Sequence, residues 1–163
     1  MKTLLLLRHA KSSWKHPELS DHDRPLNKRG KQEAPRVGAW LRAQELVPDL
    51  IISSTARRAR ETAEKVAEAS GYEGEVELDE ALYLADPEDC IAALRDVSDQ
   101  HACVMVVGHN PGLEMLLETL IRSDELMPTA AVAQVSLPVE RWRQLTLATG
   151  GALVNLWRPR DEA

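Results

Sequence analysis

The sequence predicts an α/β protein, a three-layer α/β/α sandwich whose central sheet is mostly parallel. Two continuous apolar runs, at residues 3–7 and 102–107, are typical of strands that are buried on both faces. Between and after these runs, short apolar stretches alternate with longer stretches of helical period. This alternation is expected of a parallel sheet whose two faces are covered by helices.

Each expected element has a local signal. The expected strands are residues 3–7, 50–53, 76–78, 102–107, 132–137 and 152–157. The expected helices are about 28–46, 56–70, 87–97 and 111–122. Asn27 and Asn110 are suited to N-cap the first and last helices, because asparagine accepts from free backbone N–H groups. Pro87 suits a first helical turn, and Gly71 suits a helix end.

Length and composition restrict the possible classes of protein. The 163 residues contain no repeat, linker or low-complexity tract, so we expect a single domain over residues 1–163. Lys and Arg number 20 against 26 Asp and Glu, a net charge of −6 that disfavours a nucleic-acid partner. No apolar run is long enough for a membrane span. Cys90 and Cys103 have no zinc spacing, which favours a reducing, cytoplasmic location.

Cationic and imidazole side chains follow three of the expected strands. The first strand is followed by Arg8 and His9, the second by Arg57 and Arg58, and the strand at 102–107 by His109 and Asn110. The carboxyl ends of parallel strands meet at one edge of a sheet, where ligands bind. Arginine offers a planar fork of donors that matches a phosphoryl group, so this edge is expected to bind a phosphate.

Four segments resemble those of a known family. The segments LRHAKS at 7–12, STARRARETA at 54–63 and VGHNP at 107–111 are similar to the three motifs of the histidine phosphatase superfamily. The segment DHDRPL at 21–26 resembles the compact SixA-type branch, which acts on phosphohistidine. The resemblance implies a phosphoglycerate mutase-like sandwich, without the long insertion of the mutases.

The resemblance also implies roles for individual residues. His9 matches the nucleophile that becomes phosphorylated, and Arg8, Arg58 and His109 match the groups that hold the phosphoryl oxygens. Asn110 and Arg57 are further candidates for contact with the substrate. One departure is Ala10, where the broader superfamily usually has glycine.

The general acid is left open by the sequence. Asp21 and Asp23 lie in the loop after His9 and could fold over the site, although both also suit turns. Glu80 follows the strand at 76–78 and could equally be a surface carboxylate. Asp21 is the preferred catalytic candidate. An imidazole leaving group needs less help from an acid than an alkoxide does.

These observations predict a phosphatase that forms a phosphohistidine intermediate on His9 and acts on phosphohistidine in a protein. The alternatives are a phosphomonoesterase for small molecules and a non-catalytic module that binds phosphate or phosphoproteins. The expected partner is a phosphorylated protein or a small phosphate, and neither nucleic acid nor membrane is expected. No carboxylate cluster has metal spacing, so no metal or cofactor is expected. The oligomeric state stays open.

Overall fold

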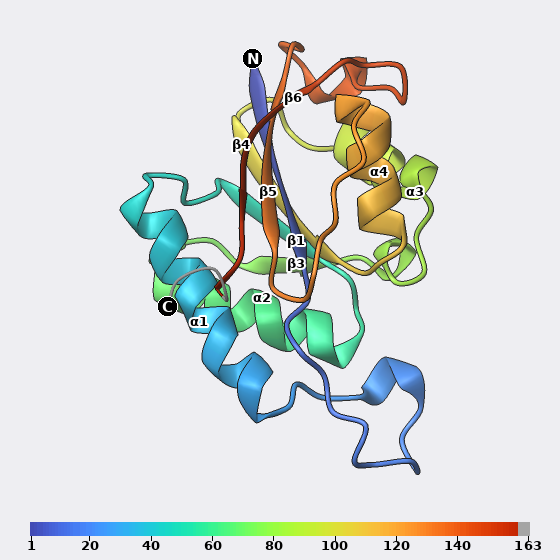
Figure 1. Cartoon of the computed structure of the whole chain (residues 1–163). Coiled ribbons are helices and arrows are strands. Elements are labelled where there is room, and N and C mark those ends of the chain that lie inside the picture. The colour runs from blue at the N-terminus through green and yellow to red at the C-terminus, as the bar shows by residue number, and fades with distance from the viewer. Residues whose placement is uncertain (160–163) are drawn as a thin grey trace.

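The computed structural model describes residues 1–159 and confirms the expected α/β architecture (Figure 1). The strands are β1 (Lys2–Arg8), β2 (Leu50–Ser53), β3 (Val76–Leu78), β4 (Cys103–Gly108), β5 (Val132–Leu137) and β6 (Ala152–Trp157). The α-helices are α1 (Lys28–Ala43), α2 (Arg57–Ser70), α3 (Pro87–Arg95) and α4 (Gly112–Ile121). Three single-turn 3₁₀ helices complete the described elements: η1 (Asp21–Asp23), η2 (Glu80–Leu82) and η3 (Trp142–Gln144).

The six strands form one mixed sheet in the order β3-β2-β4-β1-β5-β6. The first four strands in this order are parallel to one another, whereas β5 pairs antiparallel with both β1 and β6. Strands β2, β4 and β1 are therefore adjacent and end at the same edge. The residues that follow these three strands are brought side by side.

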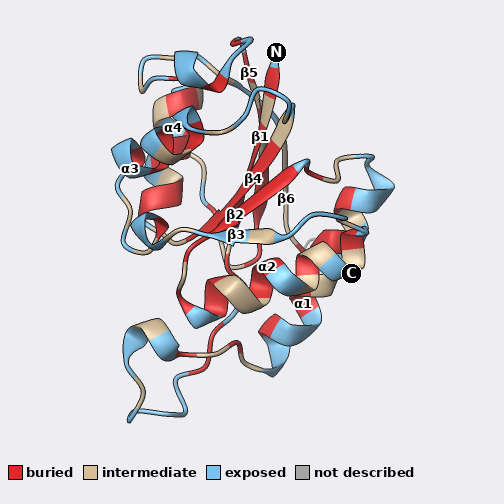
Figure 2. Cartoon of the chain, turned by 180° about the vertical axis from the view of Figure 1, so that it is seen from behind, coloured by how far each residue is buried: buried red, intermediate tan, exposed pale blue. Residues whose placement is uncertain are grey.

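Helices cover both faces of the sheet, α1 and α2 on one and α3 and α4 on the other (Figure 1). Side chains along a strand point alternately to its two faces. Leu5 and Leu7 accordingly pack with α1 and α2, whereas Leu4 and Leu6 pack with α3 and α4. All four leucines are fully buried, and the buried colouring of β1 continues across the central strands (Figure 2). Each such side chain contributes roughly 1.5–3 kcal/mol through burial.

Most of the predicted helix ends are confirmed. Asn27 Oδ1 accepts from the Gly30 N–H at 2.9 Å, and Gly71 ends α2 in the left-handed region at φ 79°. Pro87 is the first residue of α3. Helices α1 and α3 end at Ala43 and Arg95, a few residues before the predicted ends.

The prediction that Asn110 caps the last helix is wrong. Helix α4 begins at Gly112, and its N-cap position is Pro111. The Asn110 side chain does not cap the helix; its Nδ2 instead donates to the Met127 carbonyl at 2.8 Å. No helix within residues 1–159 is long and apolar enough to cross a membrane.

Candidate active site

The ends of β1, β4 and β2 bring the predicted site residues together. Arg8 pairs with Gly108 across β1 and β4, and the His9 N–H donates to the Gly108 carbonyl at 3.0 Å. On the other side of β4, the Ser54 N–H donates to the Val107 carbonyl at 3.0 Å. His9 and His109 therefore follow paired residues at the ends of the neighbouring strands β1 and β4. Their ring centroids are 5.1 Å apart.

A cavity of about 260 Å³ opens at this edge. Its lining comprises Arg8, His9, Lys11, Ser12, Trp14, Arg24, Arg58, His109, Asn110 and Thr129. Five of the predicted site residues are in this set, among them both histidines and two arginines. The volume suits a phosphoryl group together with part of the molecule that carries it.

The His9 ring uses one nitrogen for a hydrogen bond to the backbone and leaves the other nitrogen without one. Its Nδ1 lies 2.7 Å from the Ala10 carbonyl, and because a carbonyl can only accept, Nδ1 carries the proton. The Nε2 lone pair is therefore free to attack. Burial lowers the pKa of His9 to about 3, and the charges of Arg58 and Arg8 act in the same direction. The imidazole is neutral at pH 7, as a nucleophile must be.

His109 lines the same cavity and is bound through its other side to Ser54. Its Nε2 lies 2.8 Å from Ser54 Oγ, which already accepts from the Ala56 N–H, so the hydroxyl proton is available to Nε2. In that arrangement the second ring nitrogen, Nδ1, carries the proton. It is buried and has no hydrogen-bond partner within residues 1–159. Burial, together with Arg58, lowers the pKa of His109 to about 4.

The two motifs that supply His9 and Arg58 are connected by a buried threonine. The Ala10 N–H donates to Thr62 Oγ1 at 3.0 Å, and this hydroxyl donates to the Arg58 carbonyl at 2.7 Å. The Ala10 side chain belongs to the core beside α1 and α2 and does not line the cavity. The methyl group of this alanine therefore does not enter the cavity.

Asp21 holds Arg58 in place. Its carbonyl and carboxylate accept from Arg58, its Oδ1 accepts from Arg24 at 3.1 Å, and its Oδ2 accepts from the Tyr83 hydroxyl. The hydrogen bond from Tyr83, together with Arg58 and Arg24, lowers the pKa of Asp21 to about 2. A carboxyl group must be protonated to act as an acid. This geometry therefore suits Asp21 to positioning Arg58.

The other acid candidates do not line the cavity either. Asp23 is exposed, accepts from Ser20 Oγ at 3.1 Å and lies 3.6 Å from His22 Nδ1. Glu80 is exposed on η2. Within the described chain, no carboxylate lines the cavity.

Arg57 is separated from the other predicted residues. It lines a neighbouring hollow, and its Nε lies 3.8 Å from Glu61 Oε1. Successive residues of a helix point about 100° apart, so Arg57 and Arg58 cannot both face one phosphate. Contact of Arg57 with the phosphoryl group is not supported by this placement.

Sequence reasoning missed two residues around the site, Tyr83 and Arg24. Tyr83 packs edge-on against His109 with ring centroids 5.5 Å apart. Arg24 donates to Ser12 Oγ at 2.7 Å, and its guanidinium lies 3.6 Å from the centroid of the Trp14 ring. Arg24 lies in the segment 21–26, whose resemblance to the SixA-type branch could have drawn attention to it. No local sequence pattern identifies Tyr83, because its role depends on contacts with Asp21 and His109.

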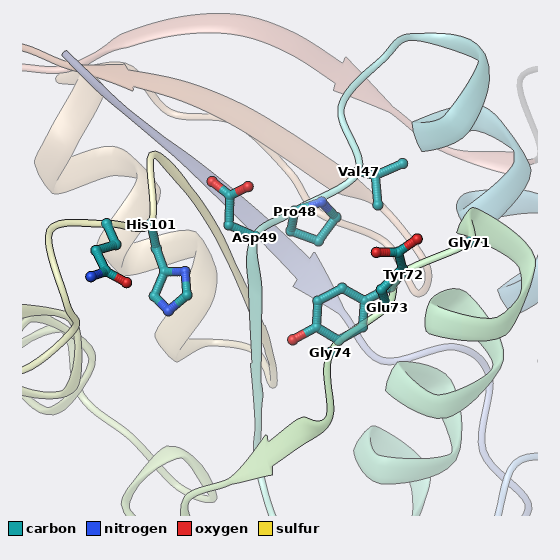
Figure 3. Close-up of a pocket in the computed structure, with 9 residues that line it drawn as sticks. Val47, Pro48, Asp49, Gly71, Tyr72, Glu73, Gly74 and His101 are labelled. Atoms are coloured by element: carbon teal, nitrogen blue, oxygen red, sulfur yellow. The ribbon is translucent and has the colours of Figure 1, made fainter.

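A larger hollow of about 470 Å³ lies at the opposite edge of the sheet (Figure 3). Its polar groups hold the strand starts. Asp49 Oδ2 accepts from the N–H groups of Ala102 and Cys103 at the start of β4, and the Tyr72 hydroxyl donates to the Glu75 carbonyl. Residues 1–159 contain no cluster of three or more potential metal ligands of the His, Cys, Asp or Glu type. The cavity beside His9 is therefore the candidate active site.

An α/β sandwich that gathers two histidines and two arginines at one strand edge is suited to binding a phosphoryl group. The model of the histidine phosphatase superfamily, branch 1, matches residues 4–83, and the chain belongs to this superfamily. An uncharacterised protein of Mycobacterium leprae is 34% identical over 167 residues, which cover 94% of this chain and 100% of that protein.

Two solved structures resemble the whole chain. Both are proteins provisionally assigned as the phosphohistidine phosphatase SixA. The Agrobacterium tumefaciens protein has a TM-score of 0.83 and 29% identity, covering 97% of this chain and 98% of its own. The Nakamurella protein has a TM-score of 0.82 and 28% identity, covering 97% and 96%. The SixA-type resemblance of the motifs is thereby confirmed.

Proposed function

We propose that this phosphatase hydrolyses phosphohistidine in a protein through a phosphoenzyme on His9. The observation that carries the proposal is the neutral His9 ring, whose Nδ1 is bound by the Ala10 carbonyl and whose Nε2 is left free beside Arg8, Arg58 and His109. The SixA-type neighbours support the choice of phosphohistidine over other phosphates.

The reaction proceeds in two displacements. Nε2 of His9 forms a bond to phosphorus while the bond between phosphorus and the substrate's imidazole nitrogen breaks, and the electron pair leaves with that nitrogen. Water then forms a bond to the phosphorus while the bond between phosphorus and His9 Nε2 breaks. The electron pair of that bond returns to Nε2, and the water's protons leave with the inorganic phosphate. Arg8, Arg58 and the Nδ1–H of a neutral His109 stabilise the charge on the equatorial oxygens in both steps.

Two features support a phosphoramidate as the substrate. No described carboxylate lines the cavity, and an imidazole is a much better leaving group than an alkoxide. A phosphate ester of a sugar would need a proton donor that this lining does not supply. In the proposed reaction the arginines supply the positive charge that a metal ion would otherwise supply, so no metal is required.

A substrate panel tests the proposal. A protein labelled on phosphohistidine, a sugar phosphate, phosphoglycerate and an aryl phosphate are each given to the enzyme with EDTA. We expect hydrolysis of phosphohistidine and of the aryl phosphate, and an acid-labile, alkali-stable phosphoenzyme on His9. Faster turnover of the sugar phosphate would support a small-molecule phosphomonoesterase. Binding of all four without turnover would indicate a non-catalytic module.

A further inference from the structure

Arg57 lines a second hollow that the proposed chemistry does not use. This hollow has a volume of about 420 Å³ and is formed by the first turn of α1, the start of α2 and the loop after His9. Arg58, the next residue, lines the active-site cavity instead. The two arginines therefore serve two different cavities at the same end of α2.

One extended segment separates the two cavities. Residues 12–15 run beside residues 24–27, with a bridge between Ser12 and Leu26 and a hydrogen bond of 2.8 Å from the Ser13 N–H to the Pro25 carbonyl. Side chains along an extended segment alternate between its sides. Trp14 lines the active-site cavity, whereas Lys15 lines the second hollow. The second hollow thus lies directly behind the wall of the active site.

The second hollow is positively charged in a protein whose net charge is −6. Its charged or titratable lining residues are Lys15, His16, Lys28, Lys31 and Arg57, and no described carboxylate lines it. Two carboxylates lie near its rim: Glu61 is 3.8 Å from Arg57, and Glu18 is 3.6 Å from His16. Three lysines therefore face the hollow without an ion pair to any carboxylate within residues 1–159, and they repel one another.

Two helices begin at this hollow with charges of the unfavourable sign. Neither α1 nor α2 has an acidic residue in its first turn, and Lys28, Lys31 and Arg57 stand there instead. Cations destabilise the positive end of a helix dipole. An anion bound in the hollow would relieve both this effect and the repulsion between the lysines.

We propose that the second hollow binds the carboxylates of an acidic segment on the phosphoprotein substrate, an inference that rests on the proposed function. A single phosphate fits less well, because the lysines and Arg57 are exposed and come from three separate elements. The active-site cavity, by contrast, is lined by the buried Arg58, which suits it to enclosing one phosphate. Dispersed, hydrated cations attract and orient a charged protein surface rather than enclose one ion.

A triple variant tests this docking role in the whole protein. Lys15→Gln, Lys28→Gln and Lys31→Gln are combined, and the matched control combines Arg42→Gln, Lys65→Gln and Arg143→Gln, which line neither cavity. On a phosphohistidine protein with an acidic surface, we expect kcat/KM of the first variant to fall roughly tenfold and to depend less on salt. On an aryl phosphate it should stay within about twofold of wild type, as should the control on both substrates.

A binding measurement separates this proposal from the proposed function. Hexaglutamate is titrated into the protein with saturating inorganic phosphate, and amide resonances are followed by NMR. We expect shifts at residues 13–16 and 26–31 that the triple variant loses. If hexaglutamate binds there but phosphohistidine is not hydrolysed, the proposed function fails and the docking site stands. The docking site is refuted if hexaglutamate leaves these resonances unchanged, or if an oligonucleotide shifts them equally.

Discussion

Asp21 binds Arg58 twice, through its backbone carbonyl at 2.7 Å and its carboxylate at 3.1 Å. The carbonyl and carboxylate belong to the loop after His9, whereas Arg58 belongs to α2. The guanidinium is therefore fixed between the loop and the cavity before any phosphate arrives. Preorganised donors of this kind stabilise developing charge without reorganising during the reaction.

Replacing His9 with glutamine should abolish turnover and leave the fold intact. The loss of the nucleophile should lower kcat roughly a thousandfold or more. Initial rates on an aryl phosphate and a phosphoenzyme trap measure the effect, and circular dichroism checks the fold. Turnover at the wild-type rate would refute the covalent mechanism.

Arg58→Gln and Arg57→Gln form a matched pair of adjacent substitutions. Arg58 lines the active-site cavity and Arg57 does not. Loss of one preorganised donor should lower kcat/KM roughly 100- to 1000-fold for Arg58→Gln. Arg57→Gln should leave aryl phosphate hydrolysis within about twofold of wild type. Equal losses in the two variants would contradict the assignment of these arginines to separate cavities.

The pH dependence of stability follows from the buried histidines. The pKa of His9 is about 3 and that of His109 about 4, both below the ordinary 6.5. Between about pH 4 and 6.5 the unfolded chain binds more protons at these positions, so stability falls as the pH falls through this window. Urea unfolding at pH 7 and pH 5 should show a smaller decrease for His9→Gln than for wild type. Identical decreases would mean that His9 titrates normally in the folded protein.

The strand ends of the site could be predicted from sequence because they depend on local patterns. The apolar run before Arg8 and His9 identifies a buried strand, and the parallel pairing of β1 with β4 then places His109 beside them. Contacts that depend on side-chain direction could not be predicted. Asn110 suits a cap by its residue type, but its amide donates to the Met127 carbonyl. The position of Tyr83 likewise depends on how the η2 segment packs against the loop after His9.

Tyr83→Phe should weaken phosphate binding without removing the reacting groups. Its hydroxyl donates to Asp21, and the ring keeps its edge contact with His109 when the hydroxyl is lost. The loss of one charge-assisted hydrogen bond should raise KM for an aryl phosphate roughly tenfold, with a smaller change in kcat. Tyr72→Phe is the matched control, because Tyr72 lies at the opposite edge of the sheet. A larger fall in kcat than rise in KM would instead place Tyr83 in the chemical step.

Asp21→Asn distinguishes a positioning role from acid catalysis. A general acid contributes roughly 100- to 10,000-fold to the departure of an alkoxide and far less to that of a nitrophenolate. Because Asp21 is ionised and bound to Arg58, we expect the variant to lose a similar factor on both kinds of substrate. Single-turnover measurement of the phosphorylation step is required, since hydrolysis of the phosphoenzyme is common to all substrates.

The same measurement on Asp23→Asn and Glu80→Gln provides the comparison for Asp21. Neither side chain lines the cavity, so both variants should phosphorylate at rates within about twofold of wild type. A selective loss on the poor leaving group in one of the three variants would identify that residue as the acid. For Asp21 such a result would require its carboxyl to gain a proton when the substrate binds, against the pull of Arg58 and Arg24. Equal losses on both substrates for Asp21 alone would establish that it acts through the guanidinium it holds.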